Sequence, residues 1–179
     1  MTTETLTKWT IDKSHSEITF KVKHLVISTV TGKFKEFDAS IETDNDEFEN
    51  ATITFEALID SIDTGNDDRD KHLKSADFFN AAEHPKLTFT TTAFKKVDIG
   101  VYKLTGDLTI RGNTKTVELD MEYGGTVRDP YGNTKARFEI NGKLNRKELR
   151  LTWSAVTEAG SIVVSDEVEL NLNVQLTLN

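Results

Sequence analysis

Apolar and polar residues alternate without a break over residues 168–178, close to the C-terminal end of the chain. A period of two places successive side chains on opposite faces of an extended chain, which is the pattern of a half-buried β-strand. Similar runs predict further strands at residues 18–24, 32–43, 51–59, 87–89, 102–110, 117–123 and 136–144. Helical periodicity is scarce, so the sequence predicts an all-β fold.

Residues that favour tight turns separate the predicted strands. They occur at residues 99–100, 111–114 and 129–133, which contain glycine, asparagine or proline. Such residues tolerate or preset the backbone angles of short connections between antiparallel strands. Because closing the sheet on itself removes exposed strand edges, we expect a closed antiparallel β-barrel of about eight strands.

Two segments depart from simple alternation. Phe34 and Phe37 are out of step by one residue within the predicted strand 32–43, which a β-bulge would explain. Residues 66–74 instead predict one short helix, because Asn66 can cap its N-terminus and the first turn is acidic. Acidic side chains there stabilise the positive end of the helix dipole.

The length of 179 residues suits a single domain, and we expect residues 1–179 to share one core. The chain has no cysteine, which excludes disulfides and thiolate chemistry. Asn66, Asp68 and Asp70 alternate like the ligands of a calcium loop, but that loop requires glycine where Lys71 stands. The sequence therefore predicts no metal and no cofactor, and it lacks the motifs of common hydrolases and phosphate-binding enzymes.

Acidic side chains outnumber basic ones by 30 to 22, which gives a formal net charge of −8. This charge repels phosphate backbones, so we expect no nucleic-acid partner. No stretch approaches the roughly 18 apolar residues of a transmembrane helix, so we do not expect an integral membrane protein. Residues 1–6 lack the pattern of a secretory signal, which predicts a cytoplasmic protein, or a periplasmic one if a signal was removed.

Phenylalanine supplies most of the aromatic bulk, with ten copies against two tryptophans and three tyrosines. Several fall on the apolar phase of predicted strands, namely Phe20, Phe34, Phe55, Phe89 and Phe138. An interior of this kind is typical both of a packed core and of a cavity for an apolar ligand, and the pattern leaves both interpretations open. Phe78 and Phe79 are adjacent, so we expect one to cap the barrel and the other to pack outside it.

Short motifs in a fixed order extend over nearly the whole chain. They include Trp9-Thr10-Ile11-Asp12, Gly32-Lys33-Phe34, Ser61-Ile62-Asp63-Thr64, Asp77-Phe78-Phe79, Gly106-Asp107-Leu108-Thr109-Ile110, Arg146 and Val164-Ser165-Asp166. No single motif is specific, but their order and spacing resemble the YceI-like family, also described as polyisoprenoid-binding. The resemblance implies a bacterial lipocalin-like barrel with a long apolar tunnel and no established catalytic activity.

The resemblance also implies the class of ligand. It predicts an isoprenoid lipid, such as a polyprenyl phosphate or a quinone-like molecule, or a fatty-acid-like amphiphile. The predicted ligand-binding residues are His15, Phe20, Val22, His24, Phe34, Phe55, Arg69, His72, Phe78, Phe79, Phe89, Leu108, Ile110 and Phe138.

Polar side chains among these candidates have alternative roles. Arg69 and His72 are three residues apart, so on one helical face they could bind a phosphate or another polar head group. Arg69 could instead pair with neighbouring aspartates on a solvated surface. His24 lies on the apolar phase of its strand and His15 precedes that strand, so each is either a ligand-binding or a structural histidine.

The favoured function is binding, sequestration or transport of an isoprenoid or other long-chain amphiphile, without catalysis. Each buried methylene contributes about 0.8 kcal/mol, so a long tail would supply most of the binding energy. One alternative is a small enzyme that acts on an amphiphile with His24 or His72 as general base, and another is an interaction module whose lipid is structural. The apolar residues 162–164 could contribute to a homodimer interface or form a buried strand.

Overall fold

The computed structural model describes residues 7–24, 28–43, 51–76, 78–149 and 164–178. Within these ranges, eleven strands form one sheet. The strands are β1 (Thr7–Ile11), β2 (Glu17–His24), β3 (Ser28–Phe34), β4 (Phe37–Thr43), β5 (Thr52–Leu58), β6 (Ile62–Asp63), β7 (Lys86–Asp98), β8 (Val101–Ile110), β9 (Asn113–Arg128), β10 (Thr134–Asn145) and β11 (Val164–Leu178). The helices in the same ranges are α1 (Asp67–Lys74) and the short 3-10 helices η1 (Lys13–His15), η2 (Ile59–Ser61) and η3 (Arg146–Leu149).

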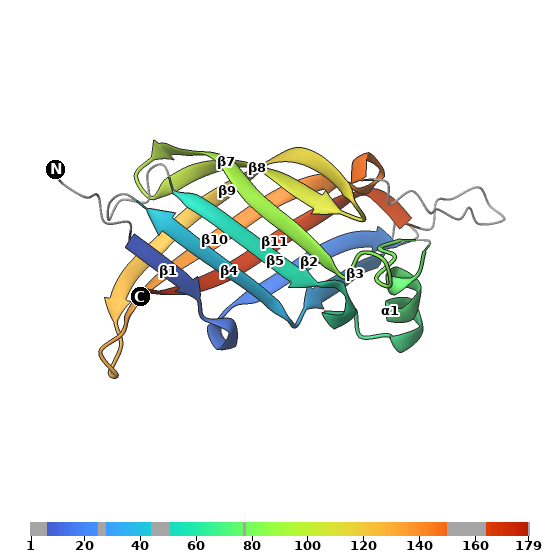
Figure 1. The fold of residues 1–179 in the computed structure, drawn as a ribbon, viewed down its shortest axis with the longest axis horizontal. Coiled ribbons are helices and arrows are strands. Elements are labelled where there is room, and N and C mark those ends of the chain that lie inside the picture. Colours follow the sequence, from blue (N-terminus) through green and yellow to red (C-terminus); the bar gives the residue numbers. More distant parts are fainter. Residues whose placement is uncertain (1–6, 25–27, 44–50, 77, 150–163, 179) are drawn as a thin grey trace.

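The sheet closes on itself into a barrel (Figure 1). Strand β1 pairs with β4 on one side and with the C-terminal end of β11 on the other. Among the described residues, this completes a ring in the order β1, β4, β5, β7, β8, β9, β10 and β11. Its pairs are antiparallel, so the predicted all-β class and the predicted closed antiparallel barrel are confirmed.

Strands β2, β3 and β6 continue the sheet beyond this ring. Strand β2 pairs with the N-terminal part of β11, β3 pairs with β2, and β6 pairs with β3. Each of the three is a direct neighbour in sequence of a ring strand. Strand β2 follows β1 after η1, β3 precedes β4 with two residues between them, and β6 follows β5 after η2. The helix α1 follows β6 and lies at this end of the barrel (Figure 1), so the two ends of the barrel differ in construction.

The break between β3 and β4 lies where the sequence predicted a β-bulge. Phe34 pairs with Ile18 in β2, whereas Phe37 pairs with Ala57 in β5. Both phenylalanines are buried, because the two-residue bend between them lets both side chains face the interior. The bulge prediction is therefore wrong, since a change of strand partner absorbs the slip in the pattern.

The local signals for the helix and for a turn are reproduced by the structure. The side chain of Asn66 accepts a hydrogen bond from the backbone nitrogen of Arg69 at 3.0 Å and so caps α1. Arg111 and Gly112 have positive φ angles of 52° and 72° in the two-residue connection between β8 and β9. Positive φ at both positions matches the twist of the flanking strands in a hairpin.

No helix in the described part of the chain is long and apolar enough to cross a membrane.

At the end away from α1, inward-facing side chains meet in the middle of the barrel. Phe138 is 1 % exposed and Met121 is fully buried. The ring of Phe138 lies 5.3 Å from that of Tyr123, and the ring of Phe94 lies 5.0 Å from that of Tyr102, measured between centroids. This part of the barrel is a packed core, as one of the two interpretations of the sequence predicted.

A charged cluster ties the break between β1 and β2 to neighbouring strands. Asp12 accepts hydrogen bonds from Lys135 Nζ at 3.0 Å and from Ser14 Oγ at 2.8 Å, and it lies 2.9 Å from His15 Nδ1. Lys135 also donates to Thr177 Oγ1 at 2.7 Å. Burial opposes the charge of Asp12, but hydrogen bonds from its three partners outweigh this effect and hold its pKa well below the usual range.

We expect Asp12→Asn to lower the free energy of unfolding by about 1–3 kcal/mol at neutral pH, because charge-assisted hydrogen bonds are lost. The folded-state pKa of Asp12 is depressed, so its contribution to stability is present above about pH 4 and is lost as the pH falls below that value. Urea unfolding at a series of pH values checks both effects. Stability of the variant should fall less steeply in acid, and equal acid slopes for the two proteins would contradict the assigned role.

Candidate ligand-binding site

An apolar cavity of about 590 Å³ lies at the end of the barrel that carries α1. Inward-facing residues of β2, β3, β8, β10 and β11 form most of its wall, and α1 with the turn after it covers one side. The apolar residues of the wall are Ile18, Phe20, Val22, Val30, Phe34, Leu73, Phe78, Phe79, Leu87, Leu108, Ile110, Leu144, Leu149, Val168, Leu170 and Leu172. A concave apolar site of this size is typical of small-molecule binding.

The cavity and the packed core occupy successive levels of the same barrel. Along β11, Val168, Leu170 and Leu172 line the cavity, whereas Val174 and Leu176 are buried in the core. Leu170 and Leu172 are only partly buried although they face the interior. An inward-facing side chain stays accessible only where nothing opposite fills the space, so the hollow begins at this level. The sequence left open a packed core and a cavity for an apolar ligand, and the barrel contains both, one at each end.

A glycine gives one side of the cavity wall room for an aromatic ring. Phe20 on β2 pairs with Gly32 on β3, and a β-carbon built on Gly32 would lie 2.3 Å from Phe20 Cζ. The Phe20 ring therefore lies over the backbone of β3. It packs 5.7 Å from the ring of Phe34, which packs edge-on against Phe79 at 6.4 Å. These three rings form a continuous apolar wall.

The turn after α1 places Phe78 and Phe79 against the cavity. The backbone nitrogen of Phe79 donates to the carbonyl of Leu73 at 3.0 Å, and Arg111 Nη1 donates to the carbonyl of Phe78 at 3.1 Å. Both rings line the cavity, so the expectation that one of them packs outside the barrel is wrong. That expectation assumed a strand, in which adjacent side chains alternate, whereas this segment is a turn.

Polar side chains from α1 and the loop before it form the rim of the cavity, and Arg69 is prominent among them. Arg69 donates from Nε to Thr64 Oγ1 at 2.8 Å and from Nη2 to the Thr64 carbonyl at 2.9 Å. Asp70 holds Thr64 in turn, because Asp70 Oδ1 accepts hydrogen bonds from the backbone nitrogen and from the hydroxyl of Thr64. The alternative in which Arg69 pairs with neighbouring aspartates is wrong, because within the described ranges its guanidinium bonds to Thr64 and forms no ion pair.

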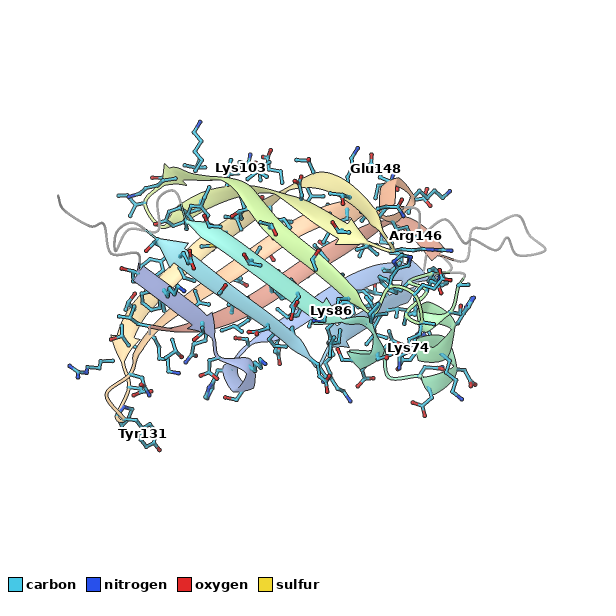
Figure 2. All side chains as sticks on the ribbon, viewed as in Figure 1. Lys74, Lys86, Lys103, Tyr131, Arg146 and Glu148 are labelled. Carbon is cyan, nitrogen blue, oxygen red and sulfur yellow. The ribbon has the colours of Figure 1, made fainter. Side chains whose placement is uncertain are left out.

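A second arginine, Arg146, lies in the wall at the α1 end of the barrel (Figure 2). Its side chain is 4 % exposed, and its Nη2 lies 3.7 Å from Asp166 Oδ1. Burial lowers the pKa of Arg146, while the Asp166 carboxylate acts in the opposite direction. The described lining contains the cations Lys23, Arg69 and Arg146 against the single carboxylate of Asp68. The cavity is thus cationic in a protein whose formal net charge is −8.

The cavity brings together many of the residues that the sequence predicted as ligand-binding. Those in its wall are Phe20, Val22, Phe34, Arg69, His72, Phe78, Phe79, Leu108 and Ile110. Arg69 and His72 both reach the cavity from α1, as their spacing predicted, and His72 packs edge-on against Phe78 with ring centroids 5.1 Å apart. Their contact with a ligand stays a prediction.

Other predicted residues lie away from the cavity. His15 belongs to η1, where its side chain is 65 % exposed and its Nδ1 faces Asp12, so it does not line the mouth. Phe55, Phe89 and Phe138 face the interior but pack with the core instead of lining the cavity. Alternation indicates which face of the sheet a residue occupies, but it does not indicate the level along the barrel.

Two predictions fall on parts of the chain that the structure does not describe. The backbone of His24 pairs with Ser28 at the end of β2, but the side chain of His24 is outside the described residues. The proposed dimer segment 162–164 is also outside them, apart from the backbone of Val164 at the start of β11. Both stay predictions.

Some residues of the cavity were missed by the sequence reasoning. Leu170 and Leu172 lie on the apolar phase of the longest alternating run, and their pairing with Phe20 and Ile18 shows why they reach the same space. Arg146 follows the last residue of β10 and enters the wall from η3, so no periodic signal marks it. The signal in the sequence that pointed to Arg146 was its position among the ordered motifs of the YceI-like resemblance.

Comparison with known proteins agrees with this architecture. A family model described as YceI-like domain matches residues 9–176. A UPF0312 protein of Staphylococcus epidermidis is 33 % identical over 175 residues, which cover 97 % of this chain and 99 % of the relative.

Solved structures share the fold. The crystal structure of the Campylobacter jejuni YceI protein is 36 % identical, with a TM-score of 0.76 over 99 % of this chain and 98 % of that one. A polyisoprenoid-binding domain from Saccharophagus degradans has a TM-score of 0.65 at 15 % identity, over 96 % of this chain and 98 % of that one. At that identity the likeness concerns the fold alone. Because the family model matches almost the whole length, this chain belongs to the YceI-like domain family.

Proposed function

We propose that this protein binds a long-chain amphiphile, isoprenoid or fatty-acyl, and keeps it soluble for sequestration or transfer, without acting on it chemically. In this proposal the chain occupies the apolar cavity, and an anionic head group, phosphate or carboxylate, lies at the cationic rim. The observation that carries the proposal is the apolar cavity of about 590 Å³ with Lys23, Arg69 and Arg146 in its lining. The fold shared with a polyisoprenoid-binding domain favours an isoprenoid as one candidate.

The energetics of the cavity favour a long apolar tail. Each buried methylene contributes about 0.8 kcal/mol, so ten of them contribute about 8 kcal/mol before the entropic cost of binding. Sixteen of the described lining residues are apolar, and Lys23 is the polar residue that the described strands add to them, so the wall favours an apolar guest. Binding energy is therefore expected to come from the tail, and orientation from the head group.

The cationic rim favours an anionic head group over a neutral one. The Nη1 of Arg69 makes none of the hydrogen bonds to Thr64, which use Nε and Nη2, so among the described residues it is available to donate to a head group at the rim. Arg146 is a buried cation with the Asp166 carboxylate 3.7 Å away, and a further anion at the rim would add to that charge compensation. Charge-assisted hydrogen bonds of this kind are about twice as strong as neutral ones.

Solvent extraction of the purified protein, followed by mass spectrometry, tests the proposal. The extract should contain one class of long-chain lipid in an amount comparable with the protein. An empty extract, together with no binding of added prenyl phosphates or fatty acids, would overturn the proposal. Recovery of a chemically altered lipid after incubation would instead favour the enzyme alternative.

We expect Arg69→Gln to weaken binding of a long-chain carboxylate about tenfold, because one charge-assisted interaction is lost. Binding of the alcohol with the same chain should stay within about twofold, since the apolar wall is unchanged. Arg137→Gln is the matched control, because Arg137 is an exposed arginine of β10 outside the cavity. Isothermal titration with the acid and the alcohol checks this, and an unchanged preference for the acid in Arg69→Gln would assign the head group elsewhere.

A further inference from the structure

The cavity ends abruptly along two neighbouring strands. Leu87 on β7 and Leu108 on β8 line the cavity. The next inward-facing positions toward the core are Phe89 on β7 and Gly106 on β8, and neither lines it. Phe89 pairs directly with Leu108 across the two strands, so the boundary between hollow and core passes between these adjacent side chains.

The ring of Phe89 occupies the space that the cavity would otherwise enter. A β-carbon built on Gly106 would lie 2.5 Å from Phe89 Cζ, so the ring extends from β7 over the backbone of β8. Phe89 is 7 % exposed, and its register partner on the other neighbouring strand is Phe55 of β5. The ring therefore fills the interior beside Leu108 and beyond Leu87, directly behind the side chains that line the cavity.

A second feature of the same design lies two strands further round the sheet, on β9 and β10. Leu144 on β10 lines the cavity, and the next inward position on that strand is Gly142. A β-carbon on Gly142 would lie 2.2 Å from Leu119 Cδ2, so the side chain of Leu119 on β9 lies over that glycine. In both places a glycine lets a large neighbour cross its strand, and Phe89 and Leu119 fill the interior at the level behind the side chains that line the cavity.

The closed inner end sets a limit on ligand length. A water molecule takes about 30 Å³ in the liquid, and if a methylene takes a similar volume the cavity has room for roughly 20 non-hydrogen atoms. We propose that Phe89 is the floor residue that sets this limit, so that the protein selects amphiphiles with chains of about 16 to 20 carbons and excludes the far end of much longer polyprenyl chains. This inference rests on the proposed function, because it assigns a chain length to the same cavity.

The wild-type protein provides the primary test, with delipidated full-length chain and straight-chain alkanoic acids of about 12 to 24 carbons as probes. Affinity should rise about fourfold for each added methylene while the tail still enters the cavity. It should level off between about 16 and 20 carbons, where the tail reaches the floor. An affinity that keeps rising to the longest acid would overturn the length limit.

The variant Phe89→Ala should move this plateau toward longer acids by about four to six carbons, because it removes about six ring atoms from the floor. Phe94→Ala is the matched control: it makes the same deletion on the same strand at similar burial, but within the packed core beside Tyr102. Its plateau should coincide with that of the wild type. A milder variant, Phe89→Leu, should move the plateau in the same direction by fewer carbons and guards against misfolding of the alanine variant.

The outcomes separate this inference from the proposed function. If neither an acid of any length nor an added prenyl phosphate binds the wild-type protein, the proposed function fails. If prenyl phosphates bind but no acid does, the chain-length assignment fails while the binding function stands. The assignment of Phe89 as floor residue fails if the affinity plateau stays at the same chain length in Phe89→Ala and Phe89→Leu. It also fails if Phe94→Ala moves the plateau as far as Phe89→Ala does. In both cases the binding function stands.

Discussion

Leu170→Trp is expected to weaken binding of a long-chain carboxylate by at least about 100-fold while the protein stays folded. Leu170 lies in the cavity wall on β11, paired with Phe20, and is only partly buried, so a larger side chain can point into the hollow. The indole adds about six non-hydrogen atoms to a space that holds roughly 20. Because each displaced methylene is worth about 0.8 kcal/mol, the ligand loses more than about 3 kcal/mol.

The adjacent residue supplies the control for this substitution. Glu169 is exposed and points away from the interior, because neighbouring residues of a strand face opposite sides. Glu169→Trp introduces the same indole on the same strand and should leave the dissociation constant unchanged within about twofold. Titration of both variants with a saturated acid of about 16 carbons checks the pair. Wild-type affinity in Leu170→Trp would show that the ligand does not use this cavity.

Phe138→Ala is expected to lower the free energy of unfolding by about 3–5 kcal/mol and the melting temperature by roughly 12 °C. Phe138 is 1 % exposed and its ring packs 5.3 Å from that of Tyr123. Neighbours in a packed core relax only partly into a deleted ring, so the cost includes a cavity as well as lost apolar burial.

The same deletion at the cavity wall should cost much less. Phe20 is only partly buried and its ring already borders the hollow, so Phe20→Ala is expected to lower the free energy of unfolding by about 1–2 kcal/mol. Thermal and urea unfolding of both variants should be measured after delipidation, because a bound ligand would add its own stabilisation. Equal costs at the two positions would contradict the division of the barrel into a packed and a hollow part.

Much of the fold could be predicted because its signals are local. The unbroken alternation of residues 168–178 is the signal for β11, and in the structure this strand begins earlier, at Val164. Asn66 caps α1, and Arg111 with Gly112 forms the expected hairpin turn. Each of these depends on a few consecutive residues, so a single sequence carries enough information to predict them.

The candidate site was only partly predictable. Phe20 and Phe89 carry the same periodic signal, yet Phe20 lines the cavity and Phe89 packs below it. Each ring lies over a glycine, Gly32 in one case and Gly106 in the other, so the difference arises from the level along the barrel at which each ring lies. The placement of Phe78 and Phe79 depends on a turn that Arg111 and Leu73 hold through hydrogen bonds.

By itself, the sequence determined that the chain forms antiparallel strands with one apolar face, which side chains occupy that face, and where a short capped helix interrupts them. The tertiary structure alone decided how far the interior is filled and where it is hollow. The physical reason is that alternation depends on neighbours along one strand, whereas filling depends on the combined volume of side chains from several strands at one level. Those side chains meet only after the barrel closes.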